Sequence, residues 1–137
     1  MPSSPASTER QALALMEHPN IAKCTDTIDN LERVGILYAY EKQYAKAEST
    51  LQQALQAAQR SPDKKLTAAA WYSYACAAAV AGHRDQAIEY LRKADDLGST
   101  DVPNMANDED LKSLRPDPRF AALIAQAKTR TAAPATK

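Results

Sequence analysis

The side chains that could carry chemistry are few and widely scattered along this 137-residue chain. Its two histidines, His18 and His83, have no cysteine, histidine or carboxylate at the spacing of a metal site. We expect His83 to lie in solvent and His18 to end a helix before Pro19. Two cysteines are too few for a disulfide framework. Cys76 lies among alanines without a basic neighbour, which predicts a small buried apolar side chain rather than a reactive thiol.

Two acidic clusters, Asp95-Asp96 and Asp108-Glu109-Asp110, are the remaining candidates. The second lacks the glycine and the alternating ligands of a calcium loop, so we interpret it as the solvated start of a helix. The sequence has no glycine-rich phosphate loop, nucleophile elbow or CxxC motif. It therefore predicts no catalytic residue, no metal and no cofactor, and a protein that is not an enzyme.

The composition favours one all-α domain over the whole chain. Only three glycines and no strand-like alternation argue against a sheet. Seventeen basic and seventeen acidic residues cancel, which favours neither nucleic acid nor a membrane surface as a partner. No apolar run could span a bilayer, and residues 1–10 do not resemble a secretory signal. The sequence thus predicts a cytoplasmic protein, with a segment of an exported protein as the alternative.

Two segments, 31–54 and 71–94, repeat each other at an offset of 40 residues. Large and small residues fall at the same places in both segments, as stacked two-helix units require. The paired positions are Leu31 with Trp71, Val34 with Tyr74, Gly35 with Ala75, Ala47 with Ala87, Leu51 with Leu91, and Ala54 with Ala94.

This pattern resembles the tetratricopeptide repeat, a helix–turn–helix unit of about 34 residues. Trp71, Tyr74-Ala75, Ala87, Leu91 and Ala94 supply its large and small positions. The resemblance implies antiparallel helical hairpins stacked as a short right-handed superhelix. The longer period implies roughly six extra residues after Ala54.

These signals predict the organisation of the chain from its N-terminus to its C-terminus. Residues 1–6 are predicted to be disordered, and 8–24 to form an N-terminal capping helix. Repeat 1 covers 25–60, with Ile28, Leu31, Val34, Leu37 and Tyr38 turned inward. Repeat 2 covers 61–98, with Ser61 as the N-cap of its first helix and Gly82 ending that helix.

A loop is expected over 99–107, before a C-terminal cap over 107–128 and a disordered tail over 129–137. The cap resembles the closing segment of many bacterial tetratricopeptide proteins, with Asp117 as N-cap and Pro118 as the first residue of its last helix. Its apolar residues would cover the end of the stack. They are Leu111, Leu114, Phe120, Leu123 and Ile124.

The resemblance implies a concave groove that holds an extended peptide or a partner helix. Carried over by alignment, its lining residues are Asp29, Glu32, Ile36, Tyr40, Tyr72, Ser73, Cys76 and Val80. A subset of the family clamps a terminal carboxylate, but Glu32 and Ile36 stand at the corresponding places and exclude that specificity. The expected groove is apolar and aromatic with an acidic rim at Asp29 and Glu32, which favours apolar anchors and a basic side chain in the ligand.

Three functions follow from this reading. The sequence favours a scaffold, adaptor or chaperone-like module that binds a protein or peptide. The alternative is a structural module that self-associates, as a homo-oligomer, or caps a larger assembly. A separate alternative is that the N-terminal helix covers some of the groove-lining residues, which then bind nothing. An enzyme with an unrecognised site is the third and least favoured reading.

Overall fold

The computed structural model describes residues 25–98 and 102–132 of the chain. Every regular element among them is a helix, which confirms the predicted all-α fold. The predictions for residues 1–6 and 8–24, with His18 and Cys24, and for residues 133–137 lie outside the described part. No described helix is long and apolar enough to cross a membrane.

The first hairpin pairs α2 (Thr25–Tyr40) with α3 (Tyr44–Gln59). Its core begins with Ile28 and Leu31 of α2, which pack against the small side chains of Ala54 and Ala57 on α3. Leu31 is completely buried, and burying a leucine stabilises the fold by roughly 1.5–3 kcal/mol. Leu37 was expected inside but is 45% exposed, because it lies on the side of α2 turned away from α3 and α4. The prediction of which residues of this helix turn inward is therefore wrong for Leu37.

The second hairpin pairs α4 (Lys64–Val80) with α5 (Arg84–Asp96). Asp63, and not the predicted Ser61, caps α4 by accepting a hydrogen bond from the Lys65 backbone N–H at 3.0 Å. Ser61 Oγ instead accepts a bond from the Asp63 N–H, which holds the capping residue in place. The turn that joins the two hairpins consists of residues 60–63.

The turns inside the two hairpins match at the same offset of 40 residues. Lys42 and Gly82 both have positive φ, at 64° and 86°. Glycine adopts this conformation freely, whereas lysine does so at a steric cost of order 1–3 kcal/mol. The backbone thus repeats more faithfully than the residue types do.

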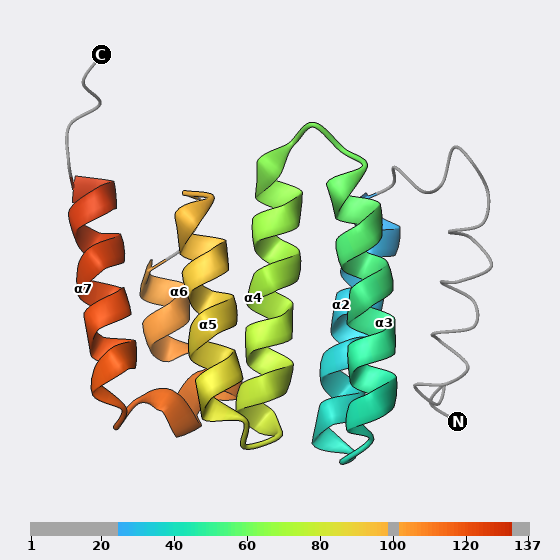
Figure 1. Cartoon of the computed structure of the whole chain (residues 1–137), viewed down its shortest axis with the longest axis horizontal. Coiled ribbons are helices and arrows are strands. Elements are labelled where there is room, and N and C mark those ends of the chain that lie inside the picture. Colours follow the sequence, from blue (N-terminus) through green and yellow to red (C-terminus); the bar gives the residue numbers. More distant parts are fainter. Residues whose placement is uncertain (1–24, 99–101, 133–137) are drawn as a thin grey trace.

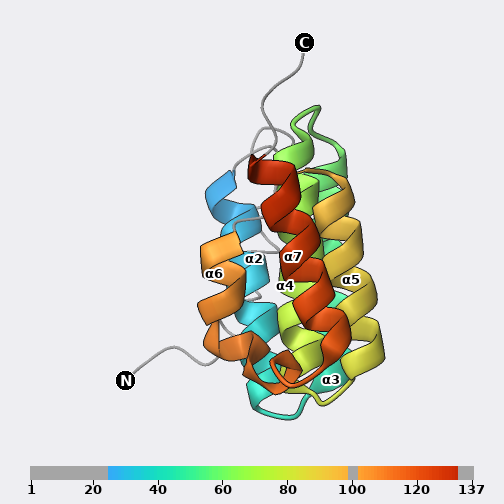
Figure 2. The ribbon, with the colours of Figure 1, turned by 90° about the vertical axis from the view of Figure 1, so that its left-hand side faces the viewer.

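Helix α4 is the centre of the molecule, in contact with α2, α3, α5 and η2 (Glu109–Leu114). Its sequence is rich in alanine and lacks a distinct polar face, as expected for a helix with neighbours on several sides. Figures 1 and 2 show the result: α2 and α6 (Val102–Asn107) lie on one side of the molecule, and α3 and α5 on the other.

The C-terminal segment follows the course of a third hairpin. The expected loop over 99–107 is wrong for residues 102–107, which form α6. Helix α7 (Pro118–Ala132) begins at the predicted proline, after Asp117, and extends four residues into the predicted tail. Leu111, Leu114, Phe120 and Leu123 join Ile88 and Leu91 in one buried cluster. The apolar residues predicted to cover the stack therefore do pack against α4 and α5.

Two ion pairs connect α5 and α7. Arg119 lies 2.8 Å from Asp85 in the first turns of the two helices, and Arg130 lies 3.2 Å from the buried Asp95 in their last turns. The helices therefore run in the same direction (Figure 1), as the second helices of successive hairpins do. Arg119 also binds Asp117, and this bond lowers the pKa of Asp117 to about 2.

We predict that Gly35→Ala destabilises the protein. A Cβ at Gly35 would lie 2.6 Å from Cγ of Leu51, which is 1% exposed, so the Leu51 side chain would have to shift. Alanine gains about 0.5–1 kcal/mol of helix propensity, but overpacking costs about 1–3 kcal/mol. Chemical denaturation should show a net loss of about 1 kcal/mol, reduced when Leu51→Ala is present as well. A stabilised Gly35→Ala protein would show that α2 and α3 are not in this close contact.

Candidate functional site

The residues predicted to line the groove do share one face. Asp29, Glu32, Ile36 and Tyr40 follow one another at helical spacing along α2, and Tyr72, Ser73, Cys76 and Val80 do so along α4. The two helices pack side by side, which brings the two rows together. Their exposure differs widely, however, and that difference decides what each residue can do.

The chain's own C-terminal segment covers the middle of this face. Asp108 Oδ2 accepts a hydrogen bond from the Tyr72 hydroxyl at 3.0 Å and a longer one from Cys76 Sγ at 3.9 Å. Asp110 accepts a bond from the Tyr40 hydroxyl, and Ser113 Oγ donates to the Ala79 carbonyl at 3.1 Å. These contacts hold η2 against the groove.

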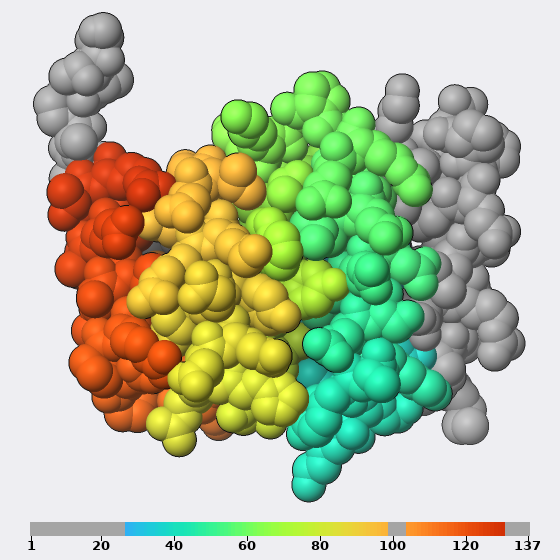
Figure 3. Space-filling model, viewed as in Figure 1, coloured from blue at the N-terminus to red at the C-terminus, as the bar shows by residue number. Residues whose placement is uncertain are grey.

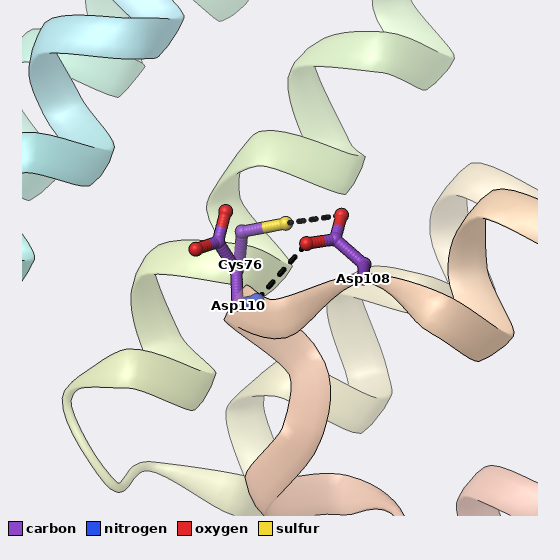
Figure 4. A group of neighbouring side chains, drawn as sticks. All are labelled: Cys76, Asp108 and Asp110. Atoms are coloured by element: carbon purple, nitrogen blue, oxygen red, sulfur yellow. Dashed lines mark hydrogen bonds between the residues drawn. The ribbon is translucent and has the colours of Figure 1, made fainter.

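Asp108 and Asp110 contact two of the predicted groove residues, Tyr72 and Tyr40, and the sequence analysis did not predict these contacts. They do start a helix, since Asp108 Oδ1 accepts the Asp110 N–H at 2.9 Å, but they are partly buried and not solvated as expected. Figure 4 shows Cys76 of α4 and Asp108 at the start of η2 pointing toward each other. The acidic cluster was visible in the sequence, but nothing there paired it with tyrosines 36 and 70 residues away.

Cys76, Asp108 and Asp110 could share a metal ion by distance, since their ligand atoms lie within 4.8 Å of one another. The carboxylates, however, already accept bonds from Tyr72, Cys76 and Tyr40. Burial and the two aspartates raise the pKa of the Cys76 thiol far above its ordinary value, which disfavours the thiolate that binds metals. We therefore interpret the cluster as a hydrogen-bonded contact between η2 and the α2–α4 face, and not as a metal site.

Glu32 does not form the predicted acidic rim. Its side chain is only 8% exposed, so Asp29, which is exposed, is the only one of the two carboxylates at the rim. Burial first, and then the nearby charge of Asp29, raise the pKa of Glu32 to about 7, while a hydrogen bond with Ser73 opposes the rise. The sequence placed Glu32 on the correct face but could not show how deep it lies.

Two hollows remain open on this face, one on each side of the part that η2 covers. The Tyr72 hollow, about 250 Å³, is lined by Glu32, Ala68, Ala69, Tyr72, Ser73, Ala94 and Asn104. The Tyr40 hollow, about 240 Å³, lies at the other end of the helices. Its lining comes from α2, the turn after α2, the first residue of α3, α4 and η2: Ala39, Tyr40, Lys42, Tyr44, Ala79, Val80, Glu109, Asp110, Lys112 and Ser113. Each hollow therefore contains predicted groove residues.

The other side of the molecule carries an aromatic cluster that the sequence analysis did not single out. The rings of Trp71 and Tyr74 each contact Tyr90, with centroids 5.7 and 5.1 Å apart, and Lys93 lies 4.6 Å above Trp71. His83, exposed as predicted, lies 5.7 Å from the ring of Tyr44. This is the α3–α5 side, which faces the viewer in Figure 3, and the hollow lined by residues of α3, α4 and α5 measures about 30 Å³.

Removing the Asp108 carboxylate should loosen η2. Asp108→Ala leaves the Tyr72 hydroxyl and the Asp110 N–H without their acceptor, which costs about 1–3 kcal/mol. A double-mutant cycle with Tyr72→Phe, followed by chemical denaturation, should give a coupling energy above about 0.5 kcal/mol. Glu109→Ala, at an exposed position of the same turn, is the control and should change stability by less than about 0.5 kcal/mol. Equal effects of Asp108→Ala and the control would contradict the contact.

Glu32 should make the protein less stable as the pH rises. Its pKa is higher in the folded state, about 7, than its ordinary value of 4.5, so folding opposes its ionisation. The free energy of unfolding is therefore highest below pH 4.5, and it falls by about 3 kcal/mol in total between pH 4.5 and 7. Glu32→Gln should therefore be more stable than the wild type at pH 8 but not at pH 4 in thermal unfolding. The same difference at both pH values would mean that Glu32 is solvated.

The comparisons with known proteins agree with this architecture. The family model of the tetratricopeptide repeat matches residues 26–95, which is half of the chain and contains α3, α4 and nearly all of α2 and α5. No curated protein and no solved structure matches the chain. The match covers the two hairpins whose large and small positions repeat at 40 residues, and the chain belongs to the tetratricopeptide repeat family.

Proposed function

We propose that this protein binds a peptide or a partner helix on the face formed by α2 and α4. The family generally provides protein–protein interaction modules, and the two hollows on this face are the observation that supports the placement. Each hollow combines a tyrosine at its edge with alanine or valine walls, which suits an apolar or amphipathic side chain of the ligand.

The ligand contacts the two ends of the face rather than its middle. Asp108 and Asp110 occupy the middle through their bonds to Tyr72 and Tyr40. A bound segment therefore lies over η2, or displaces it, and inserts side chains on both sides of it. Cys76, which is 2% exposed and in contact with Asp108, supports the floor of the face and touches no ligand.

A scaffold or adaptor role in the cytoplasm, without catalysis, fits this proposal. The polar groups that meet on the face hold η2 in place, and the raised pKa values of Tyr72 and the Cys76 thiol favour their neutral, unreactive forms. The ligand supplies the specificity by matching the hollows in shape and charge.

Self-association is the alternative function, and one observation favours it. Leu37 and Tyr40, the exposed large apolar residues of the described chain, both belong to α2. A dimer through this helix would bury Leu37, so Leu37→Glu would dissociate it. Sedimentation equilibrium of the wild type at rising concentration separates this function from binding of another protein.

Selection of displayed random peptides on the purified chain tests the proposal. Ala69 is exposed at the Tyr72 hollow, and Ala69→Arg fills the hollow at little cost in helix propensity. The selected peptides should bind this variant at least tenfold more weakly. Ala125→Arg, the same change at an exposed position of α7, is the control and should leave binding unchanged. Equal binding to both variants would remove the face from the proposal.

A further inference from the structure

One carboxylate oxygen on the binding face lacks the partner that its burial calls for. Glu32 is more than nine-tenths buried, and its Oε2 atom has no hydrogen-bond partner in the described part of the chain. Glu32 lines the Tyr72 hollow. A buried carboxylate without a full set of donors is unfavourable, so the site gains free energy from any ligand that supplies them.

The groups around Glu32 offer acceptors and apolar walls, but no positive charge. Asp29 on α2 adds a negative charge, and Ser73 on α4 shares a hydrogen bond with Glu32. On the α6 side, Asn104 Nδ2 donates to the Tyr72 hydroxyl at 3.2 Å. The other lining residues are Ala68, Ala69 and Ala94. Among the described residues, no lysine, arginine or histidine lines the hollow.

We propose that the Tyr72 hollow is a subsite for a primary ammonium group, with the Glu32 carboxylate as its acceptor. The group belongs to a lysine side chain or to the free N-terminus of the bound protein. The source of the group rests on the proposed binding function, whereas the subsite itself can be tested with a small amine.

The chemistry of the hollow favours ammonium over other cations. An ammonium group carries three donors, which match one Glu32 oxygen, the Ser73 hydroxyl and the Tyr72 hydroxyl. A guanidinium group requires both oxygens of a carboxylate for its paired bonds, and here only one is without a partner. Divalent cations require several charged oxygens, and Glu32 is the one carboxylate among the described residues that line the hollow. The alanine walls suit the methylene stem of a lysine.

Ammonium binding should depend on pH in a way that identifies Glu32. The acceptor must be ionised, and the pKa of Glu32 in the free protein is about 7. The affinity should therefore be constant above pH 8 and fall about tenfold per pH unit below pH 7. Asp29 is the other carboxylate close to Glu32.

The test is a titration of the full chain with n-butylammonium, the end of a lysine side chain, followed by NMR at pH 8. We expect saturable shifts of the Glu32 carboxyl carbon and of the Ser73 and Tyr72 amides, with a Kd on the order of 1–10 mM. 1-Butanol has the same shape without the charge and should not bind. Alanine N-methylamide presents an N-terminal amine instead, so its binding relative to n-butylammonium distinguishes the two sources.

Glu32→Gln should weaken n-butylammonium binding at least tenfold and remove its pH dependence. Glu48→Gln makes the same change at an exposed position of α3, outside this hollow, and should bind as the wild type does. No saturable shift at Glu32 in the wild type, or equal binding by Glu32→Gln, would overturn the subsite. Neither result would affect peptide selection on the α2–α4 face, so the two proposals fail separately.

Discussion

The close approach of the helices depends on small side chains at the contact points. Gly35, Ala54 and Ala87 leave space that large residues of the facing helices fill, and interiors packed at this density tolerate neither gaps nor added atoms. Helix α4 shows the consequence most clearly, because eight of its residues are buried and six of these are alanines. Only such a narrow helix can have α2, α3, α5 and η2 as neighbours at once.

The C-terminal segment packs against α4 and its neighbour α5. Its leucines and Phe120 complete the cluster on α4 and α5, and the ion pairs of Arg119 and Arg130 fix α7 beside α5. In doing so, the segment places Asp108 and Asp110 across the groove face. The α2–α4 face is thus divided into two separate hollows. Whatever loosens η2 therefore also changes the shape of this face.

The sequence was sufficient for the hairpins because their signals are local. The positions of small and large residues and the glycine turn at Gly82 all act within one helix or between neighbours in the chain. The depth of Glu32 and the contacts of Asp108 with Tyr72 depend on elements far apart in sequence, and no local pattern reports them. Leu37 shows the same limit on a smaller scale. Helical spacing predicts the direction in which a side chain projects from its helix, but whether that side chain is buried depends on the neighbouring helix.

The central claim is that the hairpins and the C-terminal segment pack against one another through these apolar contacts. Nuclear Overhauser effects between methyl groups of the full-length chain test it most directly. The account predicts cross-peaks from Leu111 and Leu114 to alanine methyls of α4, and from Leu31 to Ala54. A spectrum in which Leu111 and Leu114 show contacts only to their own neighbours in sequence would contradict it.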